Sequence, residues 1–111
     1  MGKVRIETVE NPRGGKGYTV SEHILAAGEK RGNVTMYSRV TLAPHSSIGF
    51  HMHEGTGETY FILEGEAVYN DNGEKRMIGP GESTYTPSGT GHGMENDSDK
   101  PVVFMALITE E

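Results

Sequence analysis

Short runs of apolar and β-branched residues dominate the chain from residue 34 onward. Turn residues separate these runs at intervals of roughly 8 to 12 residues, which is typical of an antiparallel sandwich or barrel. We predict strands at Val34–Leu42, Ile48–Met52, Glu58–Leu63, Glu66–Asn70, Lys75–Ile78, Ser83–Thr86, Gly91–Glu95 and Val102–Thr109. Because no segment of about 11 or more residues repeats its apolar positions every 3.6 residues, we expect little helix.

The first third of the chain has a different pattern. Residues 1–33 mix Gly, Lys, Arg and Glu around one short apolar stretch, so we predict an N-terminal arm with edge strands there and a β-barrel domain at residues 34–111. Within the arm, Arg13-Gly-Gly-Lys-Gly17 is most simply a flexible turn. The alternative is that Arg13 or Lys16 folds over a pocket mouth and meets an anionic ligand.

Composition narrows the possibilities further. A chain of 111 residues is long enough for one hydrophobic core, and its 16 glycines, about twice the usual share, indicate many tight turns. The formal charge is −6 with no basic cluster, so we expect no nucleic-acid partner. The absence of cysteine excludes disulfides, thiolate metal sites and cysteine nucleophiles.

Nothing in the sequence predicts a membrane-spanning or secretory segment. The longest apolar run, Val102–Ile108, is far too short to cross a bilayer, and the first 15 residues contain no apolar core of a signal peptide. We therefore expect a cytoplasmic protein without a membrane partner.

Three of the five histidines fall in a pattern that suits a metal ion. His51 and His53 are one residue apart, so their rings project from the same face of a strand. The Glu54-Gly-Thr-Gly57 turn can return Glu58 on the adjacent strand to the same side, and His92 follows a later glycine turn. A single histidine on a strand is more often a core residue, but three imidazoles and one carboxylate together suit a divalent ion.

The spacing of these residues resembles two motifs of the cupin superfamily, G(x)5HxH(x)3–4E(x)6G and G(x)5PxG(x)2H(x)3N. The first matches His51, His53, Glu58 and Gly65, and the second matches Gly81, Pro87, Gly89, His92 and Asn96. Only the opening glycine differs, because His45 stands in its place. Histidine is among the non-glycine residues that adopt positive φ, so we assign His45 to the turn and not to the metal.

The resemblance is to small, single-domain cupins of the oxalate-decarboxylase-like kind. It implies an all-β fold, a double-stranded β-helix (jelly-roll) barrel of two antiparallel sheets. It also implies one divalent ion per chain inside the barrel, bound by His51, His53, Glu58 and His92, with two coordination positions open. We favour Mn(II), then Fe(II), and expect that Zn(II) or Ni(II) could occupy the site in purified protein.

Strand alternation extends the predicted site. If Glu58 points inward, Tyr60 and Ile62 do too, which makes Tyr60 a candidate catalytic hydrogen-bond donor or a simple core residue. The same parity places Met94 inside and Glu54 outside, and Asn96 is expected to close a turn. The remaining large apolar residues are predicted to lie in the core or in a dimer interface: Phe50, Met52, Met77, Phe104 and Met105.

For function, the resemblance favours a metal-dependent enzyme, decarboxylase- or oxidoreductase-like, that acts on a small carboxylate or dicarbonyl such as oxalate. Oxalate decarboxylases carry an arginine three positions before the first metal histidine, where this chain has Ile48, which argues against decarboxylation of oxalate itself. Positive charge could come instead from Arg39, Arg13 or Lys16.

Other functions remain open at this stage. They are a non-catalytic small-molecule-binding or sensory cupin, a cupin dioxygenase, and a storage cupin that has lost its metal. Since small cupins usually pair through their sheets, we also predict a homodimer.

Overall fold

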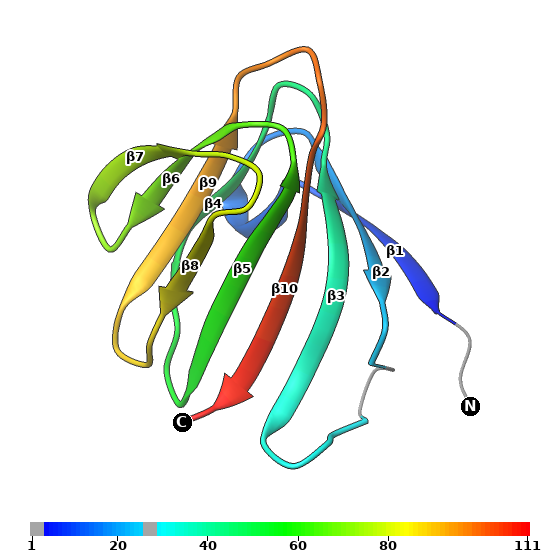
Figure 1. Ribbon diagram of the computed structural model, residues 1–111, viewed down its shortest axis with the longest axis vertical. Helices are drawn as coiled ribbons and strands as arrows, with labels where there is room; N and C mark the ends of the chain where they lie inside the picture. The colour runs from blue at the N-terminus through cyan, green and yellow to red at the C-terminus, as the bar shows by residue number, and fades with distance from the viewer. Residues whose placement is uncertain (1–3, 26–28) are drawn as a thin grey trace.

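The computed structural model describes residues 4–25 and 29–111. The strands are β1 (Arg5–Glu10), β2 (Tyr18–His23), β3 (Val34–Leu42), β4 (Ser46–Met52), β5 (Thr56–Glu64), β6 (Ala67–Asp71), β7 (Glu74–Ile78), β8 (Ser83–Thr86), β9 (Gly91–Asn96) and β10 (Val102–Glu110). They form a six-stranded antiparallel sheet in the order β1-β2-β3-β10-β5-β8 and a four-stranded one in the order β4-β9-β6-β7 (Figure 1). The predicted all-β fold of two antiparallel sheets is confirmed.

The strands predicted from residue 34 onward are all present. β3 and β8 have the predicted bounds, and the other six begin or end one or two residues away. Helix is scarce, as expected: within the described ranges it is limited to the 3₁₀ segment η1 (Pro12–Gly14). The hairpin between β6 and β7 also forms as predicted, because Asn72 and Gly73 adopt φ values of 50° and 104° between the paired residues Asp71 and Glu74.

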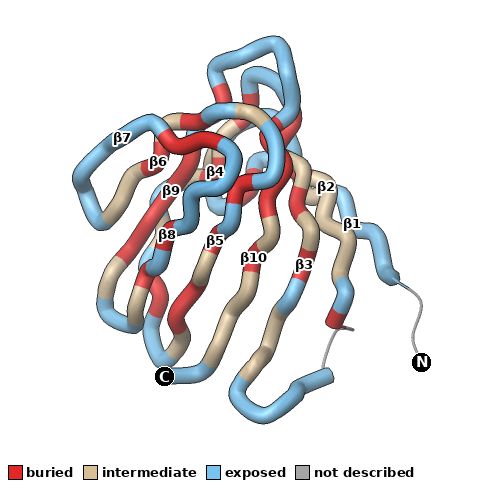
Figure 2. The backbone as a smooth tube through the Cα atoms, in the orientation of Figure 1, coloured by how far each residue is buried: buried red, intermediate tan, exposed pale blue. Residues whose placement is uncertain are grey.

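The core lies between the inner faces of the two sheets. Buried positions are concentrated along β9 and the first half of β10, whereas β1 and β7 are mostly exposed (Figure 2). Ile62 of β5 and Phe104 of β10 are almost fully buried, and burying such a side chain contributes about 1.5–3 kcal/mol. Of the apolar residues assigned to core or interface, Phe104 lies in the core, while Phe50, Met52 and Met77 are about half exposed.

The connections at one end of the barrel depend on two motif residues. His45 adopts a φ of 53°, so histidine does occupy the position where the motif has glycine. Asn96 is fully buried, and its amide nitrogen donates to the carbonyl oxygens of Leu42, Ala43 and Lys100 at 3.3, 3.1 and 2.8 Å. Asn96 therefore closes the turn after β9, as predicted, and also ties it to the end of β3.

The N-terminal residues are built into the barrel wall. β1 and β2 extend the six-stranded sheet beyond β3 (Figure 1), and η1 crosses to β4, an edge strand of the other sheet. There the amide of Ser47 donates to the carbonyl oxygen of Lys16 at 2.9 Å. Residues 1–3 and 26–28 of the predicted arm lie outside the described residues, and its division from the barrel at residue 33 stays a prediction.

Candidate metal centre

The four predicted ligands converge from three strands and both sheets. His51 of β4 is paired in register with His92 of β9, and His53 follows directly after the last residue of β4. The three imidazole centroids are 4.7 to 5.2 Å apart. Their side chains and Glu58 offer ligand atoms that all lie within 4.8 Å of one another.

One detail of the sequence-based prediction is wrong. Glu58 was expected on a strand adjacent to the histidine strand, yet β4 and β5 belong to opposite sheets. The chain crosses between the sheets at Gly55, which adopts a φ of 76°, and Glu58 then faces the histidines across the interior. The cluster consequently lies between the two sheets and not on the surface of one.

The distances between ligand atoms match the surroundings of a metal ion. His53 Nε2 lies 3.1 Å from His92 Nε2 and 3.1 Å from Glu58 Oε1, and His92 Nε2 lies 3.0 Å from the same oxygen. Ligands about 2.1–2.2 Å from an ion are about 3.0–3.1 Å apart when they occupy neighbouring corners of an octahedron. The donor set and its spacing therefore fit an octahedral divalent ion.

The other nitrogen of each ring already has a partner. His51 Nδ1–H donates to the carbonyl oxygen of Gly49 at 2.8 Å, and His53 Nδ1 lies 3.2 Å from the Thr56 hydroxyl. His92 Nδ1 lies 2.8 Å from the hydroxyl oxygen of Tyr69. Partners at Nδ1 fix the ring orientation and leave Nε2 to bind a metal, as is usual for histidine ligands.

The local electrostatics favour the protonation states that bind metals. Burial lowers the pKa of His51 below its ordinary value of 6.5, and the charges of His92 and Arg13 add to this effect. Burial alone would raise the pKa of Glu58, but hydrogen bonds from His53 and His92 outweigh it and hold that pKa below the ordinary value of 4.5. A neutral imidazole and an ionised carboxylate are the forms needed for coordination.

Tyr60 lies beside the cluster with its side chain inward, as strand alternation predicts. Its ring stacks on that of His92, with 4.8 Å between centroids and 29° between planes. Burial raises the pKa of Tyr60 well above 10, and the charge of Glu58 raises it further. Tyr60 therefore keeps its hydroxyl proton at neutral pH and can act as a hydrogen-bond donor.

A pocket of about 240 Å³ opens beside the cluster. His51, Glu58 and Tyr60 line it, together with Ile48 of β4 and Arg13 of η1. The remaining lining residues are uncharged: Val9, Pro12, Thr19, Ser21, Met36 and Ile108. A metal ion held by the cluster would thus be reachable by a small molecule from this side.

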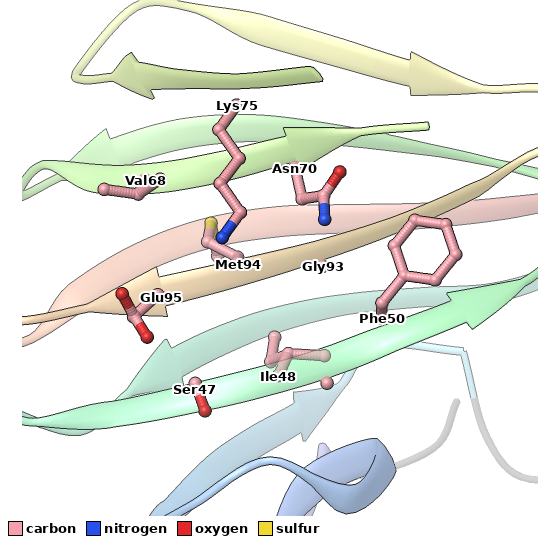
Figure 3. A pocket seen from close by; sticks show the side chains of 10 residues that line it. Ser47, Ile48, Phe50, Val68, Asn70, Lys75, Gly93, Met94 and Glu95 are labelled. Atoms are coloured by element: carbon pink, nitrogen blue, oxygen red, sulfur yellow. The ribbon is translucent and has the colours of Figure 1, made fainter. Parts of the chain in front are cut away.

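A second hollow, of about 190 Å³, lies on the four-stranded sheet and is shown in Figure 3. It forms where Gly49 and Gly93 lack side chains, and Lys75 extends over it toward Met94. None of the four clustered ligands lines this hollow. It is therefore distinct from the pocket beside the metal centre.

Other charged residues considered from the sequence lie elsewhere. His45 Nε2 pairs with Asp99 Oδ1 at 2.6 Å on the surface, and Glu54 is exposed. Arg39 pairs with Glu22 at 3.0 Å, and Lys16 is exposed and does not line the pocket. Of the three candidate cations, only Arg13 reaches the pocket.

Sequence reasoning missed the hydroxyl groups that support the ligands. The Tyr69 hydroxyl lies between His92 Nδ1 and Thr86 Oγ1, at 2.8 and 2.9 Å, and Tyr69 is fully buried. The alternation of β6 could have placed Tyr69 inside, because Ala67 shares its face. The choice of His92 as its partner, 23 residues away, carries no local signal.

Comparisons with known proteins agree with this fold. The Cupin domain family matches residues 38–108. An oxalate-binding protein of Thermotoga maritima is 39% identical over 92% of this chain and 84% of its own length. The crystal structure of a predicted oxalate decarboxylase from Thermotoga maritima superposes with a TM-score of 0.90 at 37% identity, covering 97% of this chain and 94% of that one.

Similarity extends to longer proteins. The oxalate decarboxylase of Bacillus subtilis is 30% identical over 77 residues, which are 65% of this chain but 20% of the enzyme.

No helix within the described ranges is both long and apolar enough to cross a membrane. From the family match, the two-sheet barrel and the clustered His and Glu ligands, we conclude that this chain belongs to the cupin family.

Proposed function

We propose that this protein is a metal-dependent enzyme that acts on a small carboxylate or dicarbonyl of the oxalate type. One observation carries the proposal: the four ligand atoms converge beside a pocket of about 240 Å³ that a small acid can enter. Similarity to an oxalate-binding protein supports the ligand class. A bound divalent ion would polarise a carboxylate or carbonyl oxygen as a Lewis acid.

The proposed ion is Mn(II), with Fe(II) second. Three imidazoles and one hard carboxylate suit both ions, and the ligand-atom spacing of 3.0 to 3.1 Å matches octahedral coordination, which both accept. Zn(II) and Ni(II) bind such sites more tightly by the Irving–Williams order. The metal must therefore be removed and replaced before activity is compared between ions.

Tyr60 is the proposed catalytic residue, a neutral hydrogen-bond donor to a metal-bound ligand. Four ionisable side chains line the pocket: Arg13, His51, Glu58 and Tyr60. His51 and Glu58 would bind the metal, and a guanidinium stays protonated and charged at neutral pH. Tyr60 remains, and its raised pKa keeps its hydroxyl protonated and able to hydrogen-bond a bound acid.

A turnover assay tests the proposal directly. Mn(II)-loaded protein is incubated with oxalate and related acids under air and under nitrogen, and products are measured by NMR spectroscopy. We expect product from the wild type, none from His51→Ala, and a rate reduced about 10²- to 10³-fold in Tyr60→Phe, as for loss of one hydrogen-bond donor to a developing charge. Tight acid binding without product would refute the enzyme proposal.

That last outcome would support the second candidate, a metal-dependent binding or sensory protein. It is favoured by the name of the Thermotoga relative and by the pocket lining, which offers no Asp, Glu or His as a general base besides the ligands His51 and Glu58. A third candidate, a dioxygenase, predicts product under air but none under nitrogen. The cytoplasmic location expected from the sequence stays a prediction.

We also propose a homodimer that pairs through the six-stranded sheet. Tyr37, Phe61 and Tyr85 are 40 to 53% exposed on three of its strands, and Leu107 lies beside Tyr37 in the register. Phe61→Asp should halve the mass in sedimentation equilibrium, whereas Met77→Asp on the other sheet should not. A monomeric wild type would contradict the proposal.

A further inference from the structure

Arg13 enters the pocket from an unusual backbone conformation. It lies in η1 with φ 53° and ψ 34°, and Asn11, two residues earlier, has φ 49°. An arginine in the left-handed region is uncommon and persists only where the surroundings hold it there. This conformation points to a turn held by its surroundings, whereas its glycines alone most simply predict a flexible one.

Contacts with β4 hold this turn in place. Lys16 donates its amide hydrogen to the Ser47 hydroxyl at 3.1 Å and accepts one from the Ser47 amide at 2.9 Å. The two backbones approach so closely at Gly15 and Gly49 that a Cβ atom on Gly15 would overlap the Ser47 carbonyl oxygen, and one on Gly49 that of Arg13. Only glycine permits this approach. It holds the backbone of Arg13 against Gly49, which lies two residues before the ligand His51.

The Arg13 guanidinium has no carboxylate partner among residues 4–25 and 29–111. By contrast, Arg31, Arg39 and Arg76 each pair with an acidic side chain, at 3.0, 3.0 and 2.7 Å. Arg13 instead lines the pocket with His51 and Glu58. Its charge is thus available to a ligand.

The charges around the pocket add up to a site for a dianion. A divalent ion, the Glu58 carboxylate and the Arg13 guanidinium together carry a net charge of +2. The pocket volume of about 240 Å³ suits an acid of few atoms. A planar guanidinium donates two parallel hydrogen bonds to a pair of carboxylate oxygens, whereas a hydroxyl offers a single acceptor atom and a methyl group offers none.

Building on the proposed function, we propose that Arg13 is the specificity-determining residue of this pocket. Its guanidinium binds the carboxylate oxygens that face away from the metal and so selects small dicarboxylates over monocarboxylates. Ile48, which lines the same pocket, is uncharged, so the cation comes from the N-terminal turn.

Calorimetric titration of Mn(II)-loaded protein with oxalate and with glycolate tests this inference. The test variant is Arg13→Gly, because glycine accepts the φ of 53° and removes only the side chain. We expect it to bind oxalate about 10- to 100-fold more weakly, as for a lost charge-assisted hydrogen-bond pair, with glycolate affinity changed less than about threefold. Arg13→Lys should recover part of the loss.

Lys16→Ala is the matched control, since it removes the same charge three residues away from a side chain outside the pocket. It should leave both affinities within about twofold of the wild type. If Arg13→Gly binds oxalate as tightly as the wild type, or loses the same affinity for oxalate and for glycolate, the inference about Arg13 is overturned. The proposed function is untouched by either result. A wild type that binds metal but neither acid overturns the proposed function together with the inference.

Discussion

The strands that carry the metal ligands and the turn that carries Arg13 are held in different ways. β4, β5 and β9 are hydrogen-bonded within the two sheets, with a register shift in the β4–β9 pairing between Ile48 and His51, and three of the four ligands are at least 95% buried. The N-terminal turn is exposed at Arg13 and attaches to β4 through backbone contacts at Gly15, Lys16 and Ser47. This difference implies that metal binding and acid recognition are separable, so that either can be removed while the other remains.

Removing a ligand should have the largest effect. His51→Ala takes away an Nε2 ligand at a half-buried position. We expect metal affinity to fall by more than about 100-fold, which exceeds the 10- to 100-fold cost of removing a residue that only hydrogen-bonds a ligand. Competition with a fluorescent chelator measures it. The control is His45→Ala, on the surface, which should keep full affinity. Equal affinities in both variants would contradict the ligand assignment.

Removing a supporting hydroxyl should weaken the metal less. Tyr69→Phe deletes the oxygen that lies 2.8 Å from His92 Nδ1, so the ring loses the partner that orients it. Metal affinity should fall about 10- to 100-fold. Tyr85→Phe, on the exposed face of β8, is the control. An unchanged affinity in Tyr69→Phe would mean that packing alone orients His92.

The two regions also differ in how far sequence predicts them. His51 and His53 could be assigned because a strand of period 2 sends both rings to one side, and strand alternation also placed Tyr60 and Ile62 correctly. The position of Arg13 could not be assigned, because its left-handed turn depends on contact with Ser47 and Gly49, more than 30 residues away.

The same limit applies inside the barrel. That Glu58 comes from the opposite sheet depends on how the chain crosses at Gly55, which spacing alone does not reveal. The hydrogen bond between Tyr69 and His92 likewise joins strands whose pairing has no local signature. Local periodicity gives the direction of a side chain, and long-range contacts decide what it meets.

Displacing the turn should affect the acid and not the metal. Gly15→Ala keeps Arg13 in the chain, but its Cβ would overlap the Ser47 carbonyl oxygen and push the turn away from β4. We expect oxalate affinity of the Mn(II)-loaded protein to fall about tenfold while metal affinity stays within about twofold. If both fell together, the two regions would not be separable.

Acidification should destabilise the metal-free barrel gradually. The pKa of His51 lies below 6.5 in the folded protein, so the unfolded chain binds the proton more readily. The contribution of His51 to the free energy of unfolding is therefore fully present above pH 6.5 and is lost as the pH falls through the folded pKa. The contribution of Glu58, whose folded pKa lies below 4.5, is lost at lower pH. Thermal unfolding after chelator treatment measures this. We expect the midpoint temperature of unfolding to fall further in the wild type than in His51→Ala between pH 7.5 and 5.5. An equal or smaller fall in the wild type would contradict the role of His51.

The central claim is that a divalent ion bound by His51, His53, Glu58 and His92 presents open positions to a small dicarboxylate. A crystal of the Mn(II)-loaded protein grown with oxalate, with anomalous data at the manganese edge, tests it most directly. We predict one anomalous peak about 2.0–2.3 Å from the four ligand atoms, with oxalate oxygens completing the shell. A peak elsewhere, or a metal whose remaining positions are closed to oxalate, would contradict the claim.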